Sequence, residues 1–152
     1  MTGPELPASL EQEGPAADRD PANNRSAPAA TVGLQVPAVD VYVSTLRLIA
    51  ASVATRSELT VDDVEDLRLA VDEACSLLLP HALPGTTLNA EFALSPGFLG
   101  VDVSVAAADG AEPDHTGYAW TVLSALAGPV TTRFGDGRLI IALAKRRAPS
   151  AP

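Results

Sequence analysis

The hydrophobic positions between residues 60 and 79 recur every three or four residues, which is the spacing of one face of an α-helix. These positions are Val64, Leu67, Val71, Ala74 and Leu78. Thr60 followed three residues later by Asp63 is the pattern of a capping box, which predicts where the helix begins. Pro80 lacks the backbone amide that a helix interior needs, so we expect the helix to end near Leu79.

The same spacing predicts two further helices. The apolar face of the first, over about residues 40–55, consists of Tyr42, Leu46, Ile49 and Val53. Asp40 is the expected N-cap of this helix, because its side chain can accept a hydrogen bond from a free amide of the first turn. The second, over 118–126, is expected to end at Gly128-Pro129 and to face the core with Val122, Leu123 and Leu126.

Alternating apolar and polar positions predict strands, because successive side chains of a strand point to opposite faces of a sheet. The predicted strands are 31–36, 86–94, 99–107, 130–134 and 138–145. The turn residues at 95–97 and 135–137 join two pairs of these strands as hairpins. The element order predicts an α+β two-layer sandwich, in which a mixed, mostly antiparallel sheet carries all helices on one face.

The ends of the chain differ in composition from this domain. Residues 1–30 hold five of the 13 prolines and almost no large apolar side chain. Burial cannot offset the entropy of ordering such a segment. We therefore expect a disordered tail over 1–30, one domain over 31–147 and a short tail over 148–152.

Charge and composition exclude several functional classes. The formal net charge of −9 gives a potential that repels nucleic-acid phosphates and anionic membranes. One cysteine and two histidines support neither an intramolecular disulfide nor an ordinary metal site. The first residues lack the pattern of a signal peptide, and no run of about 18 apolar residues occurs. We expect a cytoplasmic protein that binds no nucleic acid or membrane directly and that has no metal site built from its cysteine and histidines.

Several motifs are similar to those of a known family. They are VPA at 36–38, Arg47, EDLRLAVDEAC at 65–75, HA at 81–82, VLSALAGPV at 122–130 and RLIIALAK at 138–145. With these motifs the chain resembles the bacterial anti-sigma factor serine kinases, which have the histidine-kinase and Hsp90-like ATPase fold. The resemblance covers about residues 31–147 and is strongest to the actinobacterial regulators of stress and sporulation sigma factors. It implies the same sandwich as the residue pattern.

The resemblance implies a catalytic helix that this sequence keeps only in part. Glu73 matches the family's general base. One turn later, where the family has an Asn that holds Mg²⁺, this chain has Leu77. Mg²⁺ requires oxygen ligands, which a leucine cannot provide. Glu73 taken alone also fits a solvated carboxylate on the polar face of a helix.

The resemblance further implies an adenine-reading turn and a glycine-rich lid around the phosphates. Asp109 and Gly110 match the turn in a shifted position, and Ala107 stands near the place of the family's aspartate. Of the lid glycines, Gly117 alone is present. We interpret Asp109, Gly110 and Gly117 as remnants of an ATP site, so ATP and Mg²⁺ are candidate cofactors and phosphoryl transfer is expected to be lost or weak.

Three other residues have more than one interpretation. The resemblance assigns Arg47 to contacts with protein partners, and its planar guanidinium suits carboxylates at an interface. It also fits a solvated helix arginine with an acidic neighbour. Trp120 fits either the core or an anchor for a partner, and Cys75 fits a small core residue.

The favoured hypothesis is an anti-sigma factor that sequesters an alternative sigma factor and is released by an anti-anti-sigma protein. Its acidic surface suits the basic surface with which a sigma factor meets promoter DNA. The resemblance also implies a homodimer built around the sheet edge and the first helix. The alternatives are an active kinase that uses Mg-ATP and Glu73 to phosphorylate the anti-anti-sigma protein, and a former kinase domain that serves as an interaction module in another pathway.

Overall fold

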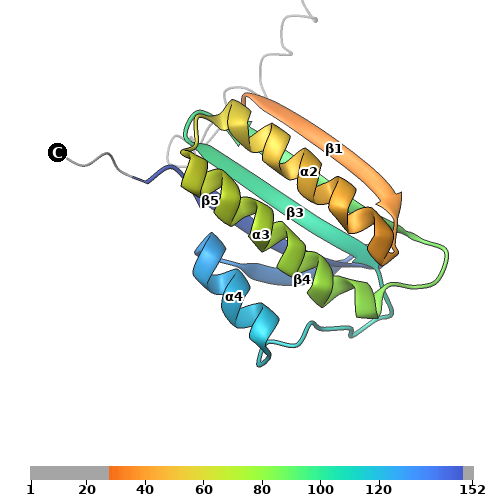
Figure 1. The fold of residues 1–152 in the computed structure, drawn as a ribbon. Helices are drawn as coiled ribbons and strands as arrows, with labels where there is room; N and C mark the ends of the chain where they lie inside the picture. Colours follow the sequence, from red (N-terminus) through yellow and green to blue (C-terminus); the bar gives the residue numbers. More distant parts are fainter. Residues whose placement is uncertain (1–27, 149–152) are drawn as a thin grey trace, which may run out of the picture.

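The computed structural model describes residues 28–148, and its sheet contains five strands (Figure 1). The strands are β1 (Ala30–Pro37), β2 (Thr87–Ser95), β3 (Phe98–Ala106), β4 (Thr131–Gly135) and β5 (Arg138–Arg146), in the spatial order β1-β2-β3-β5-β4. The α+β sandwich is confirmed. All four strand pairings are antiparallel, so the sheet is more regular than the mixed, mostly antiparallel arrangement that we expected.

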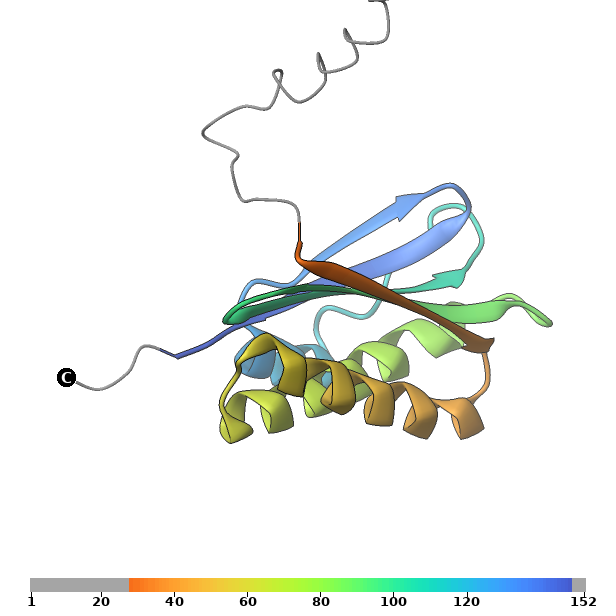
Figure 2. The same cartoon turned by 90° about the horizontal axis from the view of Figure 1, so that it is seen from above.

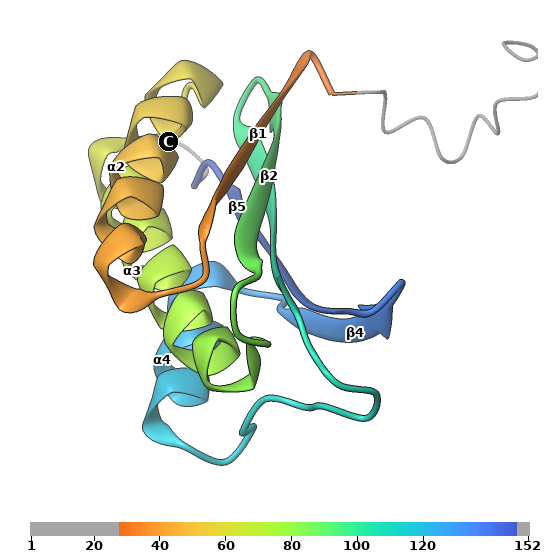
Figure 3. The same ribbon diagram turned by 90° about the vertical axis from the view of Figure 1, so that its right-hand side faces the viewer.

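The helices α2 (Val43–Ala54), α3 (Val61–Leu78) and α4 (Tyr118–Ala127) cover one face of the sheet (Figures 2 and 3). Short 3₁₀ turns precede α2 (η3, Asp40–Tyr42) and follow α2 and α3 (η4, Thr55–Ser57; η5, Leu79–His81). The helix α3 lies between α2 and α4 and packs against both (Figure 1). Two different neighbours therefore meet its two sides.

The core lies between the two layers. Alternate residues of the strands point at the helices and are buried, and Phe92 and Ile141 are among the largest fully buried side chains. Leu46 of α2 and Leu67 of α3 meet them from the helix layer and are also fully buried. The apolar residues that recur with period two in the strands and with period 3.6 in the helices thus pack together in one core.

The start of α3 agrees with the sequence. The amide of Asp63 donates to Thr60 Oγ1 at 3.1 Å, and the amide of Thr60 donates to Asp63 Oδ2 at 3.2 Å, which completes the capping box. Burial alone would raise the pKa of Asp63, but the hydrogen bonds with Thr60 outweigh it and hold that pKa below its ordinary value.

The start of α2 differs from the prediction. Asp40 is not an N-cap: it lies in the 3₁₀ turn η3, and the residue at the N-cap of α2 is Tyr42, which makes no side-chain capping bond. A 3₁₀ turn has three residues per turn instead of 3.6, so it rotates Tyr42 off the apolar face. Tyr42 is exposed, and Ala50 and Ala54 complete the buried face of α2.

The strand β1 begins at Ala30, one residue earlier than expected, and Ala30 pairs with Leu94. Most of the predicted N-terminal tail, residues 1–27, and most of the predicted C-terminal tail, residues 149–152, lie outside the described residues. Within the part of the chain that is described, no helix is both long and apolar enough to cross a bilayer.

Candidate functional site

The helix α3 carries the candidate site, and its two sides have different neighbours. On the side towards α4 and β5, Asp66 accepts a hydrogen bond of 3.1 Å from Lys145 of β5, whose ammonium group also donates to the carbonyl of Leu126 in α4. Glu73 and Leu77 lie seven and eleven residues after Asp66 and so belong to the same stripe of the helix. On the other side, Asp72 meets α2.

Glu73 is a half-buried carboxyl on α3. Partial burial raises its pKa above the ordinary value, and the negative charge of the adjacent Asp72 raises it further. A raised pKa makes a carboxylate a better proton acceptor, which is the property that a general base needs. The direction of this pKa shift is the one that suits a general base, which is the role that the resemblance implies for Glu73.

Leu77 cannot act as the metal ligand that the resemblance implies at its position. Its side chain is only 7% exposed and belongs to the hydrophobic core. The position one turn after Glu73 is thus filled by hydrocarbon and provides no oxygen for Mg²⁺. Nowhere between residues 28 and 148 do three His, Cys, Asp or Glu side chains gather in a group that could hold a metal ion.

The turn after β3 contains the predicted adenine-reading residues. Asp109 is exposed, and Gly110 has a φ of +84°, a conformation that glycine adopts without strain. The amide of Ala111 donates to the carbonyl of Ala108 at 3.1 Å and closes the turn. Ala107, which stands near the place of the family's aspartate, is buried and offers only a methyl group. The glycine at 110 is therefore explained by the turn itself.

Gly117 also has a local role. It is the N-cap of α4. Asp114 Oδ1 accepts from the amide and the hydroxyl of Thr116 at 2.9 and 2.7 Å, and Oδ2 lies 2.9 Å from the place where a Cβ on Gly117 would be. A side chain at position 117 would require the exposed carboxylate of Asp114 to move. The hydrogen bonds from Thr116 hold the pKa of Asp114 below its ordinary value, so a negative charge already lies beside the start of α4.

The described residues therefore do not fit a Mg-nucleotide complex held in the manner of the family. Leu77 and Ala107 are buried hydrocarbon where the resemblance implies a metal ligand and an aspartate. Three surface hollows, of about 530, 500 and 330 Å³, are all lined by other residues. We derive no reaction step through a nucleotide for this reason.

The side of α3 towards α2 has a different character. Arg47 of α2 donates to Asp72 Oδ1 at 2.9 Å, and the two side chains are 33% and 32% exposed. Arg68, one turn before Asp72, pairs with Glu65. The two arginines line the hollow of about 330 Å³, together with Leu48, which is 69% exposed. The sequence identified Arg47 but not its partner, because no pattern relates residues 25 positions apart.

The remaining candidates have structural roles. Cys75 is buried, and burial raises the pKa of its thiol to about 12, so it is an unreactive core residue. Trp120 is partly buried and packs against the core. Its ring meets that of His115 edge to face, with 4.4 Å between the centroids.

Comparison with known protein families shows to which family this chain belongs. Residues 36–136 match the family described as the histidine kinase-like ATPase domain. The chain belongs to this family. Within it, the chain is 37% identical over 123 residues to the anti-sigma-F factor RsbW of Mycobacterium tuberculosis strain H37Rv, covering 80% of this chain and 73% of that protein. It is 38% identical over 65 residues to the serine-protein kinase RsbW of Halalkalibacterium halodurans, covering 42% of this chain and 40% of that kinase.

A solved structure shows the same histidine kinase-like ATPase fold. The crystal structure of the RsbU and RsbW domains of a Mycobacterium tuberculosis protein superposes on 82% of this chain with a TM-score of 0.62 and 16% sequence identity. This chain covers 34% of that longer protein, so the likeness concerns one part of it.

Proposed function

We propose that the chain is an anti-sigma factor, which sequesters an alternative sigma factor by protein contact and releases it to an anti-anti-sigma antagonist in the cytoplasm. The observation that carries the proposal is the 37% identity to an anti-sigma-F factor over 80% of this chain. The proposal extends to a homodimer, as in the sequence-based hypothesis.

The outer surface of α2 is the candidate for partner contact. It combines the guanidinium of Arg47, held by Asp72, with Leu48, which is 69% exposed. Val41 of the preceding turn η3 is 71% exposed. Exposed apolar side chains beside an arginine are typical of protein interfaces. The net charge of −9 favours a partner with a basic surface, and carboxylates of that partner are suited to the two arginines of this hollow.

Sequestration is consistent with the apolar residue Leu77, one turn after Glu73. Holding a partner requires complementary surfaces and no phosphoryl transfer, whereas transfer depends on a metal ion and on positioning. Leu77 and the carboxylate of Asp114 remove two of the features that transfer needs, and neither lies on the α2 surface. The proposed function therefore uses the α2 surface, which Leu77 and Asp114 do not affect.

The first experiment is capture of the tagged full-length chain from its own cell extract, with and without Mg-ATP, followed by mass spectrometry. We expect the same sigma factor to be retained in both conditions. Retention that requires Mg-ATP would contradict sequestration without nucleotide, and the absence of any sigma factor from both captures would contradict the proposal itself.

The second experiment tests the α2 surface by Arg47→Glu. A glutamate at this position faces Asp72 and repels carboxylates of the partner, so we expect binding of the captured sigma factor to weaken at least about tenfold. Arg56→Glu makes the same change of charge at an exposed position of η4 and is expected to leave binding unchanged. Circular dichroism checks that both variants are folded. Equal affinities of the two variants would remove Arg47 from the interface.

A second candidate function is that of a serine kinase acting on the anti-anti-sigma protein. The observation in its favour is the raised pKa of Glu73, which suits a general base. Transfer of labelled phosphate to the antagonist, abolished by Glu73→Gln and kept by Glu65→Gln on the exposed side of α3, would establish it. We expect no transfer from the wild-type chain.

A further inference from the structure

A hollow of about 270 Å³ lies at the end of β5. The strand β4 pairs with β5 only as far as Ala142, so within residues 28–148 no strand continues along the last residues of β5 on that side. The chain that follows α4 forms another wall of the hollow. The residues that line it include Phe98, Ala127, Pro129, Ala144, Lys145 and Arg146.

The two cations of this hollow differ in their partners. The ammonium group of Lys145 donates to Asp66 and to the carbonyl of Leu126, so its charge is already compensated. Arg146 is exposed, and its guanidinium lies 4.9 Å from the centre of the Phe98 ring. Of the salt bridges found among the described residues, none involves Arg146. The hollow therefore offers apolar walls beside a cation that can bind a carboxylate.

The N-terminal part of the sequence contains a segment of matching chemistry. Leu6 and Leu10 are the large apolar residues between positions 2 and 27, and three glutamates accompany them at positions 5, 11 and 13. Residues 5–13, with the sequence ELPASLEQE, therefore combine two leucines with three carboxylates and hold no basic residue. Such a segment is complementary to an apolar hollow that has an arginine at its rim.

The chain enters β1 at the same end of the sheet as this hollow. The amide of Ala29 donates to the carbonyl of Leu94 at 2.8 Å. In the register of the sheet, Leu94 is opposite Leu99, and Leu99 is opposite Lys145. Three inter-strand steps of about 4.8 Å, or about 14 Å in total, separate β1 from β5. Residues 14–27 can span roughly 45 Å when extended, so the segment 5–13 can reach the hollow.

We infer that the hollow at the end of β5 binds residues 5–13 of the same chain, with a leucine against Phe98 and Ala144 and a glutamate at Arg146. A short connection between a segment and its site gives an effective concentration on the order of millimolar. A contact that is weak for a separate peptide is therefore well populated in the intact chain. An acidic peptide of another protein can bind this hollow only by displacing the segment.

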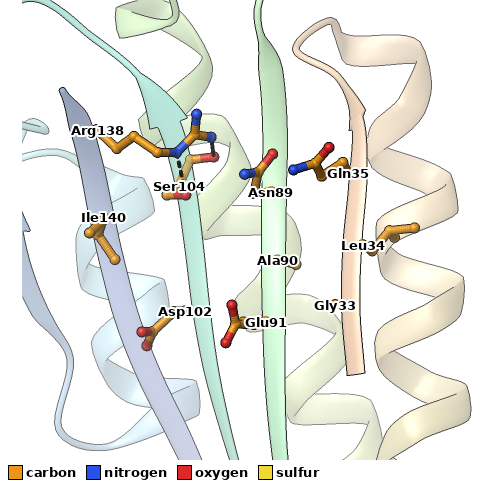
Figure 4. A pocket seen from close by; sticks show the side chains of 10 residues that line it. All are labelled: Gly33, Leu34, Gln35, Asn89, Ala90, Glu91, Asp102, Ser104, Arg138 and Ile140. Atoms are coloured by element: carbon orange, nitrogen blue, oxygen red, sulfur yellow. Dashed lines mark hydrogen bonds between the residues drawn. The ribbon is translucent and has the colours of Figure 1, made fainter. Parts of the chain in front are cut away.

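A larger hollow, of about 500 Å³, lies on the face of the sheet opposite the helices and suits this segment less well (Figure 4). Its lining includes the carboxylates of Glu91 and Asp102, which are directly opposite each other in the register and repel glutamates. Its arginine, Arg138, already donates to Ser104 Oγ at 3.0 Å and to the carbonyls of Ser104 and Thr87. The smaller hollow is therefore the better site for an acidic and apolar segment.

A spin label on the segment tests this contact in the full-length chain. Gln12→Cys provides the labelling site, and Cys75 does not compete for the label, because its thiol is buried and its pKa is raised to about 12. We expect the label to broaden the amide signals of Phe98 and Ala144 in nuclear magnetic resonance spectra. The amide signal of Arg138, about 26 Å from Arg146 along β5, is expected to keep its width.

Two variants of the labelled chain separate the apolar part of the contact from the charged part. Leu10→Ser removes a leucine of the segment, and Arg146→Glu reverses the charge at the rim, so we expect each to lower the broadening at least about threefold. Leu10→Ser changes no residue of the described domain, so its effect cannot come from unfolding. The controls are Ala17→Ser, outside the segment, and Arg133→Glu, roughly 20 Å from Arg146 in the register. Both are expected to leave the broadening unchanged.

Three results would overturn the inference: no broadening at the hollow, broadening spread evenly over the surface, or broadening that neither Leu10→Ser nor Arg146→Glu reduces. A mixture of spin-labelled chain with isotope-labelled chain that carries no spin label tests for another occupant. Broadening in this mixture would assign the hollow to the segment of a second copy and would also overturn the inference. The sigma-factor proposal is tested separately, because neither residues 5–13 nor Arg146 belong to the α2 surface.

Discussion

The two sides of α3 differ in what they present to their neighbours. Towards α2, Asp72 forms an ion pair with Arg47, and the surface around it is charged, hollowed and accessible. Towards α4, Glu73 is followed one turn later by the buried Leu77, and Asp114 lies beside the start of α4. The side proposed for partner contact thus has a formed ion pair and an accessible hollow. The side on which the resemblance implies a nucleotide site has no oxygen ligand at Leu77.

Under the proposed function, one helix has lost one function and kept another. The residues on its two sides share a backbone, but their energies depend on separate neighbours, so a change on one side alters the other little. Under the proposal, this domain keeps its fold and its partner surface although Leu77, a core residue, stands where the resemblance implies a metal ligand. The following variants test this independence.

The largest effect is expected from Leu77→Asn, which places the family's amide back on α3. It removes a buried aliphatic side chain and buries an amide, so we expect the free energy of unfolding to fall by about 2–4 kcal/mol in urea denaturation. The neighbouring Ser76→Asn is exposed and should change it by less than about 0.5 kcal/mol. A loss as small as that of Ser76→Asn would show that this side of α3 is not packed as described.

A smaller effect is expected from Thr60→Ala, which removes the capping hydroxyl that both sides of α3 share. We expect a loss of about 1 kcal/mol, measured against Thr45→Ala on the exposed surface of α2. The pKa of Asp63 is lowered in the folded state. The stability that its carboxylate contributes is therefore present above the ordinary pKa of 3.8 and is lost as the pH falls through the folded-state pKa. If Thr60→Ala lowers the free energy of unfolding equally at neutral and at strongly acidic pH, this linkage is contradicted.

The ion pair between α2 and α3 is expected to contribute less. Both side chains are about a third exposed, so water screens the pair, and Asp72→Asn should cost about 0.5–1 kcal/mol. A double-mutant cycle with Arg47→Gln isolates the coupling energy. If the cycle gives no coupling, Arg47 is not held by Asp72 in solution.

The smallest effect is expected from Glu73→Gln. The pKa of Glu73 is raised in the folded state, so the charged form costs stability as the pH rises above the ordinary value of 4.5. Removing the charge should raise the free energy of unfolding at pH 7 by at most about 0.5 kcal/mol and have no effect at pH 3. Unfolding curves at the two pH values check this, and a loss of stability at pH 7 would contradict the raised pKa.

Much of the fold could be predicted from the sequence because its elements have local causes. The capping box of Thr60 and Asp63 and the alternation of β2 depend on residues close in the chain. The start of α2 could not be predicted in this way, since the 3₁₀ turn that rotates Tyr42 outward leaves no distinct pattern. For the candidate site, the sequence identified Glu73 and Leu77 but missed Asp114, whose carboxylate lies beside Gly117 at the start of α4.

The sequence by itself determined the element types, the layer arrangement and the absence of an oxygen ligand at Leu77, because each follows from the nature or the spacing of nearby residues. Only the tertiary structure decided which charges meet. Arg47 and Asp72, or Glu91 and Asp102, become neighbours through helix packing and strand register across long stretches of chain. Electrostatic energies depend on distance and burial, and these are properties of the folded molecule.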